Sequence, residues 1–440
     1  MTKLFLILVL ISLTENRLPW LNVAAVLLFV PLYLLSQSNQ ASNVDSVPRA
    51  TLRWVKAAYV FWLFSYLLTR APISNLFSFE FLRRDGALFF AYLPLIIICN
   101  YSLDRKFLQQ AVAAYLSVMS GVAVLGALAY LEALGNISIS TAILPENLQV
   151  VFNSATAGYE FHGLYEAHNA AGAVYGLAAC LSLCLLVFSE HRKIWSLPRF
   201  WFSATFVGLM LSKSRTSYIA FAATALMFLV MKSGHRRTML KIMIFLLLPL
   251  TYFLVAQSDV LQRAQAVDDN DDPNIVSRWV GFERAVDDFI TSPIIGIGLG
   301  RYNDDYLTFS GTEHVVYVAT GGQVINESSH AHNSYLHFLA EGGVIGFGLM
   351  MAIWISAYRW TRRIRAHFSE NTFPYALAAG VQACIIYEFC ISFTEHSMGT
   401  AVTSLTIFTM FGVLRNLAGS VLAEQPAAVQ CPIRFRPSTA

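Results

Sequence analysis

Runs of apolar residues recur along nearly the whole chain, and short polar segments separate them. Most of these runs approach the roughly 20 residues that a helix needs to cross a bilayer core. The runs are 3–13, 20–36, 54–69, 86–99, 107–134, 167–189, 199–212, 216–231, 239–257, 343–360, 373–393 and 398–416. Their spread excludes a soluble domain with a single membrane anchor. The pattern predicts an all-α integral membrane protein with about 12 transmembrane helices.

The composition agrees with a membrane protein. Only 13% of the 440 residues are charged and 56% are hydrophobic, and the mean hydropathy is +0.54. In a soluble domain, roughly a quarter of the residues are charged. The net charge of +3 indicates no particular partner, and we expect contacts with membrane lipids and none with nucleic acid.

The basic residues predict the orientation, because loops on the cytoplasmic side carry an excess of Lys and Arg. With the N-terminus inside, 20 of the 30 Lys and Arg residues face the cytoplasm. The ten others are Arg17, Arg70, Arg83, Arg84, Lys213, Arg215, Arg263, Arg278, Arg284 and Arg301. This count predicts a multi-pass membrane protein with both termini in the cytoplasm.

The longest outward segment is 258–342, which far exceeds the usual length of a connection and is where function is expected. We therefore divide the chain into helices 1–9 (1–257), this outward loop, helices 10–12 (343–418) and a cytoplasmic tail (419–440). Within the loop, "SRWVGFERAVDDFITSP" has apolar residues at helical spacing. It predicts an amphipathic surface helix that starts at Ser277 and ends before Pro293.

Titratable residues gather in "HAHNSYLHFLAEGGVIGF", at the expected outer mouth of the tenth helix. A neutral imidazole accepts a proton near neutral pH without a metal, so His332 is a candidate base and Asn333 a candidate substrate contact. The alternative is that these side chains line an aqueous interface. His330 and His337 are neighbours that would share or take over the role of His332.

Three arginines are candidates for binding an anion. Arg215, in "LSKSRTSYIAF", lies close to the hydrophobic boundary, where a guanidinium favours an anionic partner. Arg278 starts the surface helix, and Arg301 follows the glycine-rich "GIGLG". The structural alternatives are a snorkelling side chain for Arg215, a solvated first-turn residue for Arg278, and an ordinary turn around Arg301.

Other polar residues have no assigned role. His168 and Asn169 start the sixth predicted helix and are possible pocket residues. Glu388 lies inside the eleventh helix, where a neutral, hydrogen-bonded structural role is favoured, and Glu395 is in the turn after it. Arg70, Arg83 and Arg84 contact lipid phosphates or anchor the interface. The acidic patch 268–272 lacks the pattern of an EF-hand, and we expect no metal site and no cofactor.

The motifs together resemble one family. "SRWVGFERAVDDFITSPIIGIGLGRYNDDY" followed by "HAHNSYLHFLAEGGVIGF" is similar to the signature of the O-antigen ligase and polymerase superfamily of bacterial membrane glycosyltransferases. "SKSRTSYIAF" and "GLYEAHNAAGAVYG" resemble the motifs that precede it. The resemblance covers about 155–410, and the order of the motifs agrees.

The resemblance implies a GT-C-like enzyme that moves a glycan from undecaprenyl diphosphate to an acceptor hydroxyl on the periplasmic side. His332 matches the catalytic histidine of the family, and Arg215 and Arg278 match arginines that hold the diphosphate. A single inverting displacement without a metal would follow.

Three functions remain open from the sequence. The first is an O-antigen ligase that joins O-antigen to lipid A-core in lipopolysaccharide biosynthesis. The second is a polymerase of O-antigen or exopolysaccharide, with a glycan as acceptor. The third is a twelve-helix transporter, although such proteins usually have two related halves around a site in mid-membrane, and here the candidate residues cluster outside.

Overall fold

The described part of the chain is mainly helical in the computed structural model. It comprises residues 49–68, 92, 103–135, 149–153, 158–165, 167–188, 197–231, 273–302, 316–317, 324–325, 331–398 and 401–424. The helices are α3 (Arg49–Leu68), α7 (Arg105–Ala133), α8 (His168–Phe188), α9 (Leu197–Leu211), α10 (Arg215–Met231), α13 (Pro273–Thr291), α15 (Ser334–His367), α16 (Phe373–Ile391) and α17 (Ala401–Glu424). Two antiparallel strand pairs complete it: β1 (Gln149–Asn153) with β2 (Gly158–Gly163), and β3 (Val316–Tyr317) with β4 (Val324–Ile325).

Eight predicted transmembrane segments coincide with helices: α3, α7, α8, α9, α10, α15, α16 and α17. Among the described residues, α7, α8, α15 and α16 are long and apolar enough to cross a membrane. The predicted segments 3–13, 20–36, 86–99 and 239–257 lie outside the described residues, apart from Tyr92. The total of about 12 spans and the GT-C-like arrangement stay predictions.

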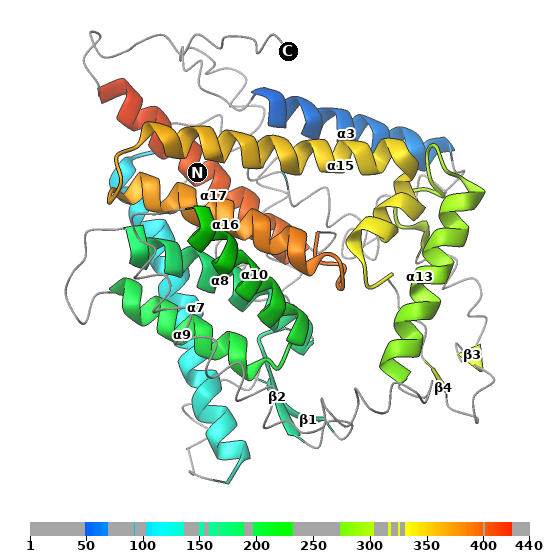
Figure 1. The fold of residues 1–440 in the computed structure, drawn as a ribbon, viewed down its shortest axis with the longest axis horizontal. Coiled ribbons are helices and arrows are strands. Elements are labelled where there is room, and N and C mark those ends of the chain that lie inside the picture. Colours follow the sequence, from blue (N-terminus) through cyan, green and yellow to red (C-terminus); the bar gives the residue numbers. More distant parts are fainter. Residues whose placement is uncertain are drawn as a thin grey trace.

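The core is built around α8 and α16, which are apolar around their whole circumference and buried along most of their length. Such helices pack at the centre of a bundle. In Figure 1, α7, α9, α10 and α17 gather around these two helices, and α8 packs against both α9 and α16. Gly176 of α8 lies against the ring of Tyr387 of α16, where a larger residue would overlap that ring.

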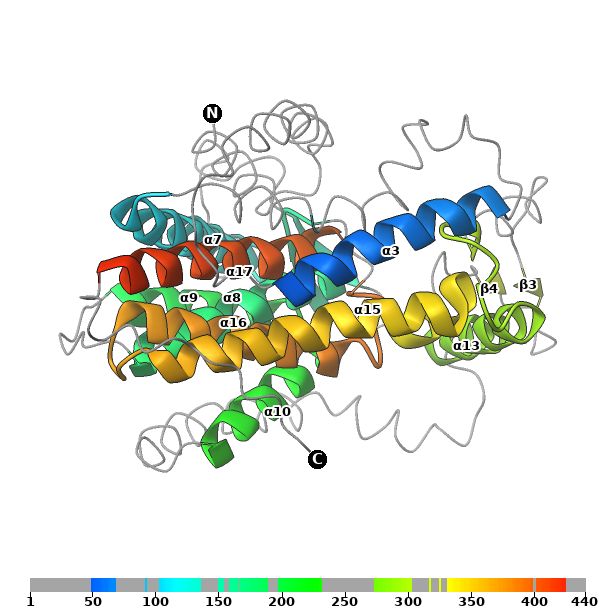
Figure 2. The same ribbon diagram turned by 90° about the horizontal axis from the view of Figure 1, so that it is seen from above.

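A second layer consists of α15 and α3, which run side by side along one edge of the bundle (Figure 2). The outer faces of the peripheral helices are apolar: the exposed fraction is 70% for Val60 and 55% for Phe64 on α3, and 68% for Ile219 on α10. Soluble proteins rarely expose large apolar side chains in such numbers. These faces fit contact with lipid.

The helix α15 breaks at Gly343, which has φ 58° inside the helix. The turn after α13 docks on this break through four backbone hydrogen bonds: from Ile297 N–H to Ala340 O (2.9 Å), Gly298 N–H to Glu341 O (3.0 Å), Val344 N–H to Pro293 O (2.9 Å) and Ile345 N–H to Ile294 O (3.2 Å). The break falls where the predicted outward loop meets the tenth helix. It separates the site segment from the part of α15 that fits a membrane span.

The amphipathic helix expected in the long loop is α13, which crosses the end of α15 (Figure 1). It ends before Pro293 as predicted, but it begins at Pro273 and not at Ser277. Proline is favoured in the first turn because its φ is fixed and its missing N–H is not needed there. The predicted apolar face is divided, since Ala285 is buried whereas Val286 and Ile290 are exposed.

Candidate active site

Glu395 joins two of the predicted site residues. It lies in the turn between α16 and α17 and is mostly buried. Its Oε1 accepts a hydrogen bond from Nη2 of Arg278 at 3.2 Å, and its Oε2 lies 3.8 Å from Nδ1 of His332. One carboxylate thus brings together α13, the start of α15 and the α16–α17 turn.

The backbone presents His332 in an unusual conformation. Its φ is +48°, a left-handed value that is uncommon for a residue with a side chain and costs of order 1–3 kcal/mol. Such residues persist where surrounding contacts hold them, and they cluster at functional sites. The side chain is partly buried, with 20% of its surface exposed, so it is fixed on the protein side and still accessible to a substrate.

Asn333 and Ser334 supply those contacts. Asn333 caps α15, because its Oδ1 accepts hydrogen bonds from the backbone N–H groups of Tyr335 and Leu336 at 2.9 and 3.0 Å. Its Nδ2 donates to the carbonyl of Phe393 at 3.0 Å. The Ser334 hydroxyl donates to the carbonyl of Glu395 at 3.0 Å. These bonds give Asn333 a positioning role, and its expected contact with substrate stays a prediction.

Arg278 lies in the first half of α13, and a third of its side-chain surface is exposed. A guanidinium has five N–H donors, and the contact with Glu395 uses Nη2. Glu395 holds the arginine by one edge while part of the group faces outward. This geometry suits an arginine that binds a second, soluble or lipid-borne anion.

Arg215 is exposed and is the first residue of α10. The turn before it contains Lys213 at φ 55°, and the buried hydroxyls of Ser214 and Ser217 are 2.8 Å apart. This turn packs against Gly172 in the first turns of α8. The ion pairs that define the Glu395 cluster do not include Arg215, so its role as a phosphate ligand stays a prediction.

The glycine-rich segment before Arg301 has a structural function. Gly296 and Gly298 have positive φ angles of 72° and 112°, and a Cβ on Gly296 would overlap the backbone of Glu341. They permit the turn to dock on α15, as expected for the turn alternative. Arg301 is partly exposed beside this turn, and a contact with an anion stays a prediction.

His337 belongs to a buried polar group with Glu341 and His396. Its Nε2 lies 3.5 Å from Oε2 of Glu341, and its ring centroid is 3.8 Å from that of His396 and 5.0 Å from that of Tyr302. His337 is 4% exposed. These contacts favour a structural role and distinguish it from His332; His330 lies outside the described residues.

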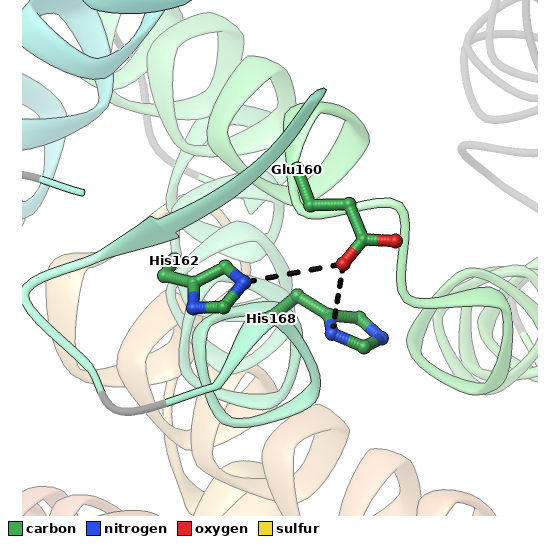
Figure 3. Close-up of side chains that lie close together, drawn as sticks. All are labelled: Glu160, His162 and His168. Carbon is green, nitrogen blue, oxygen red and sulfur yellow. Dashed lines mark ion pairs between the residues drawn. The ribbon is translucent and has the colours of Figure 1, made fainter. Parts of the chain in front are cut away.

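His168 belongs to a separate cluster, which Figure 3 shows. Its Nδ1 lies 3.1 Å from Oε2 of Glu160, and Nε2 of His162 lies 3.9 Å from the same oxygen. The three side chains provide ligand atoms within 4.8 Å of one another, so this group has the donors to hold a metal ion.

The sequence left the role of Glu395 unassigned, since a carboxylate in a short turn resembles an ordinary solvated residue. Its one signal was its place in the short turn after the predicted eleventh helix, on the same expected outer side as His332. Glu388, by contrast, accepts a hydrogen bond from Thr403 at 3.5 Å and is fully buried, in line with the structural role expected for it. Arg70, Arg83 and Arg84 lie outside the described residues.

These features define a helical membrane protein with a polar site at one end of its bundle. Residues 200–351 match the family described as O-antigen ligase, which supports the resemblance to the O-antigen ligase and polymerase superfamily. The matched region includes Arg215, Arg278 and His332, whereas Glu395 and the cluster around His168 lie outside it. No curated protein matches the chain.

Proposed function

We propose that the protein is an inverting glycosyltransferase that transfers a glycan from undecaprenyl diphosphate to an acceptor hydroxyl. The favoured reaction is ligation of O-antigen to lipid A-core, and polymerisation on a glycan acceptor is the alternative. The family match supports a ligase or polymerase in general terms. The observation that carries the proposal is that Glu395 draws Arg278 and His332 into one cluster.

In this proposal His332 is the general base. Glu395 faces Nδ1, so a proton on Nδ1 would be directed at the carboxylate and Nε2 would accept the proton of the acceptor hydroxyl. The imidazolium that forms is stabilised by the nearby negative charge of Glu395. The orientation of the ring is then fixed before the substrate arrives.

The acceptor oxygen attacks the anomeric carbon as the bond from that carbon to the diphosphate oxygen breaks. The leaving diphosphate gains negative charge, and Arg278 is placed to stabilise it. Because Glu395 neutralises part of the charge of Arg278, a second cation is needed for a diphosphate. Arg215 is our candidate for this cation. A single displacement inverts the anomeric configuration.

The distribution of charge supports a periplasmic site. The end of α15 remote from His332 carries Arg359, Arg362, Arg363 and Arg365, and α7 begins with Arg105 and Lys106 at the same end of the bundle. Cytoplasmic ends are enriched in such residues. The His332 end would therefore face the periplasm. There, cleavage of the bond between the glycan and its diphosphate carrier supplies the free energy for transfer, and no nucleotide is needed.

The test is a transfer assay with purified protein, an undecaprenyl diphosphate-linked glycan, and either lipid A-core or a second lipid-linked repeat as acceptor. His332→Ala should lower kcat by about 10²- to 10⁴-fold, as expected for loss of a general base. Arg278→Ala should lower kcat by about 10²-fold, as expected for loss of one group that stabilises a developing anion. Product on lipid A-core alone identifies a ligase.

The matched controls are His367→Ala and Arg362→Ala, which change exposed residues at the opposite end of α15 and should leave the rate within about twofold of the wild-type rate. Product formed only from two lipid-linked repeats would identify the polymerase. Full activity of His332→Ala, or movement of the donor across the membrane without a glycosidic product, would contradict the proposed enzyme.

A further inference from the structure

The cluster of Glu160, His162 and His168 is built by local structure. Side chains alternate between the two faces of a strand, so Glu160 and His162 share one face of β2 and Phe161 points to the other. Phe161 is fully buried, and its ring lies 5.7 Å from that of Tyr175 on α8. Burial of Phe161 thus fixes the direction in which Glu160 and His162 point.

The chain then turns sharply to bring in the third side chain. Gly163 has φ 60°, a value that glycine adopts without cost, and Tyr165 N–H donates to the carbonyl of His162 at 3.1 Å. His168 follows as the first residue of α8. The ligand atoms are separated by few residues along the chain, so little loop entropy opposes their convergence.

Both imidazoles face the same carboxylate oxygen (Figure 3). The distances to Oε2 of Glu160 are 3.1 Å from Nδ1 of His168 and 3.9 Å from Nε2 of His162. Ligands of a tetrahedral zinc ion lie about 2.0–2.2 Å from the metal, which places neighbouring ligand atoms about 3.3 Å apart. A modest movement of His162 would bring all three atoms to this spacing.

We propose that Glu160, His162 and His168 form a binding site for one divalent transition metal ion, for which zinc is the best fit. Two imidazole nitrogens and one carboxylate are a common donor set for zinc, whereas magnesium and calcium prefer oxygen ligands. Glu160 is 4% exposed, and a buried carboxylate that faces two imidazoles favours a cation between them.

The ion would pin the β1–β2 hairpin to the start of α8. The side chain of His168 is 31% exposed, so the fourth coordination position would be open on that side. The proposal does not rest on the proposed transfer reaction, and no step of that reaction uses the ion.

The test is zinc binding by the full chain, purified through an affinity tag without histidines and stripped with chelator. Titration with zinc alone, followed by elemental analysis after gel filtration, should give one zinc per chain. Glu160→Gln, His162→Ala and His168→Ala should each weaken zinc binding by at least about tenfold. Loss of a residue that only supports a metal ligand already lowers metal affinity by about 10- to 100-fold. Zinc should also raise the unfolding temperature of the wild type and not that of Glu160→Gln.

The matched controls are His367→Ala and Glu370→Gln, which change exposed residues and should keep wild-type affinity. If a cluster variant fails to fold, the wild type still tests the site: zinc should protect His168 from diethyl pyrocarbonate, as mapped by mass spectrometry. Wild-type protein that binds no zinc, or affinity unchanged in all three cluster variants, would overturn the proposal.

Discussion

At the scale of single residues, Glu395 links the two sides of the candidate site, because it contacts both Arg278 and His332. In the proposed reaction, removal of its charge would have opposite effects on two steps. The imidazolium would lose the anion that stabilises it, and the diphosphate would be attracted more strongly to Arg278. We therefore propose Glu395 as a positioning residue whose loss should separate catalysis from binding.

We expect Glu395→Gln to lower kcat by about 10- to 100-fold, because the imidazolium would lose the negative charge that lies 3.8 Å from its Nδ1. The KM for the lipid-linked donor should stay constant or fall, since an opposing negative charge is gone. Steady-state kinetics with varied donor measure both constants. A merely structural role would raise KM as kcat falls, and Glu370→Gln, at an exposed turn, serves as control.

The residues of the site were partly predictable. The position of His332 directly before an apolar run, together with the family resemblance, made it the candidate base, and the structure places it beside Glu395. The partner of Arg278 was not predictable, because Glu395 lies 117 residues further along the chain. The two meet only because α13 and the α16–α17 turn both pack against the start of α15. Glu160 and His162 escaped notice for a similar reason: their pairing with His168 depends on the strand β2, which the pattern of apolar runs does not predict.

At the scale of elements, the docking of the α13 turn on the break in α15 holds the site together. Gly343 has φ 58° and ψ −164°, a region that is essentially restricted to glycine. A Cβ at this position would overlap the backbone of Ile294. The break and the turn thus depend on each other, and both precede the part of α15 that fits a membrane span.

Gly343→Ala should lower the free energy of unfolding by about 1–3 kcal/mol through backbone strain, and by more through the overlap with Ile294. Thermal unfolding in detergent measures the shift. The control is Gly348→Ala in the same helix, where a Cβ would meet nothing within 4 Å. This substitution should stabilise the helix by roughly 0.5–1 kcal/mol. Equal stability of the two variants would contradict the docking role.

The elements followed from the sequence to different degrees. Hydropathy located eight helices, because a continuous apolar run can satisfy its backbone hydrogen bonds inside a bilayer by forming a helix. It also located the boundary at Gly343. The start of α13 was predicted four residues too late, because Ser277 was taken as a cap although Pro273 suits a first turn equally well. The short strands β1 and β2 were missed, because strands of five or six residues outside the membrane leave a weak pattern.

At the scale of the whole molecule, charge separates the two ends of the bundle. The ends of α15 and α3 remote from the site carry most of the arginines of these helices, whereas the end with His332 carries paired charges such as Arg278 with Glu395. At about 1.5 Å of rise per residue, the part of α15 after the break at Gly343 would be about 36 Å long. It is long enough to cross a bilayer core of about 30 Å, so we expect the two ends of the bundle to lie in different compartments.

This separation predicts opposite labelling of two single cysteines in a variant whose six native cysteines are replaced by alanine. Ala167→Cys, exposed next to α8, and Glu370→Cys, exposed between α15 and α16, lie at opposite ends of the bundle. A membrane-impermeant maleimide added to spheroplasts should label Ala167→Cys directly and Glu370→Cys only after permeabilisation, because arginine-rich ends stay in the cytoplasm. The reverse result would place His332 on the cytoplasmic side, where a periplasmic transfer is impossible.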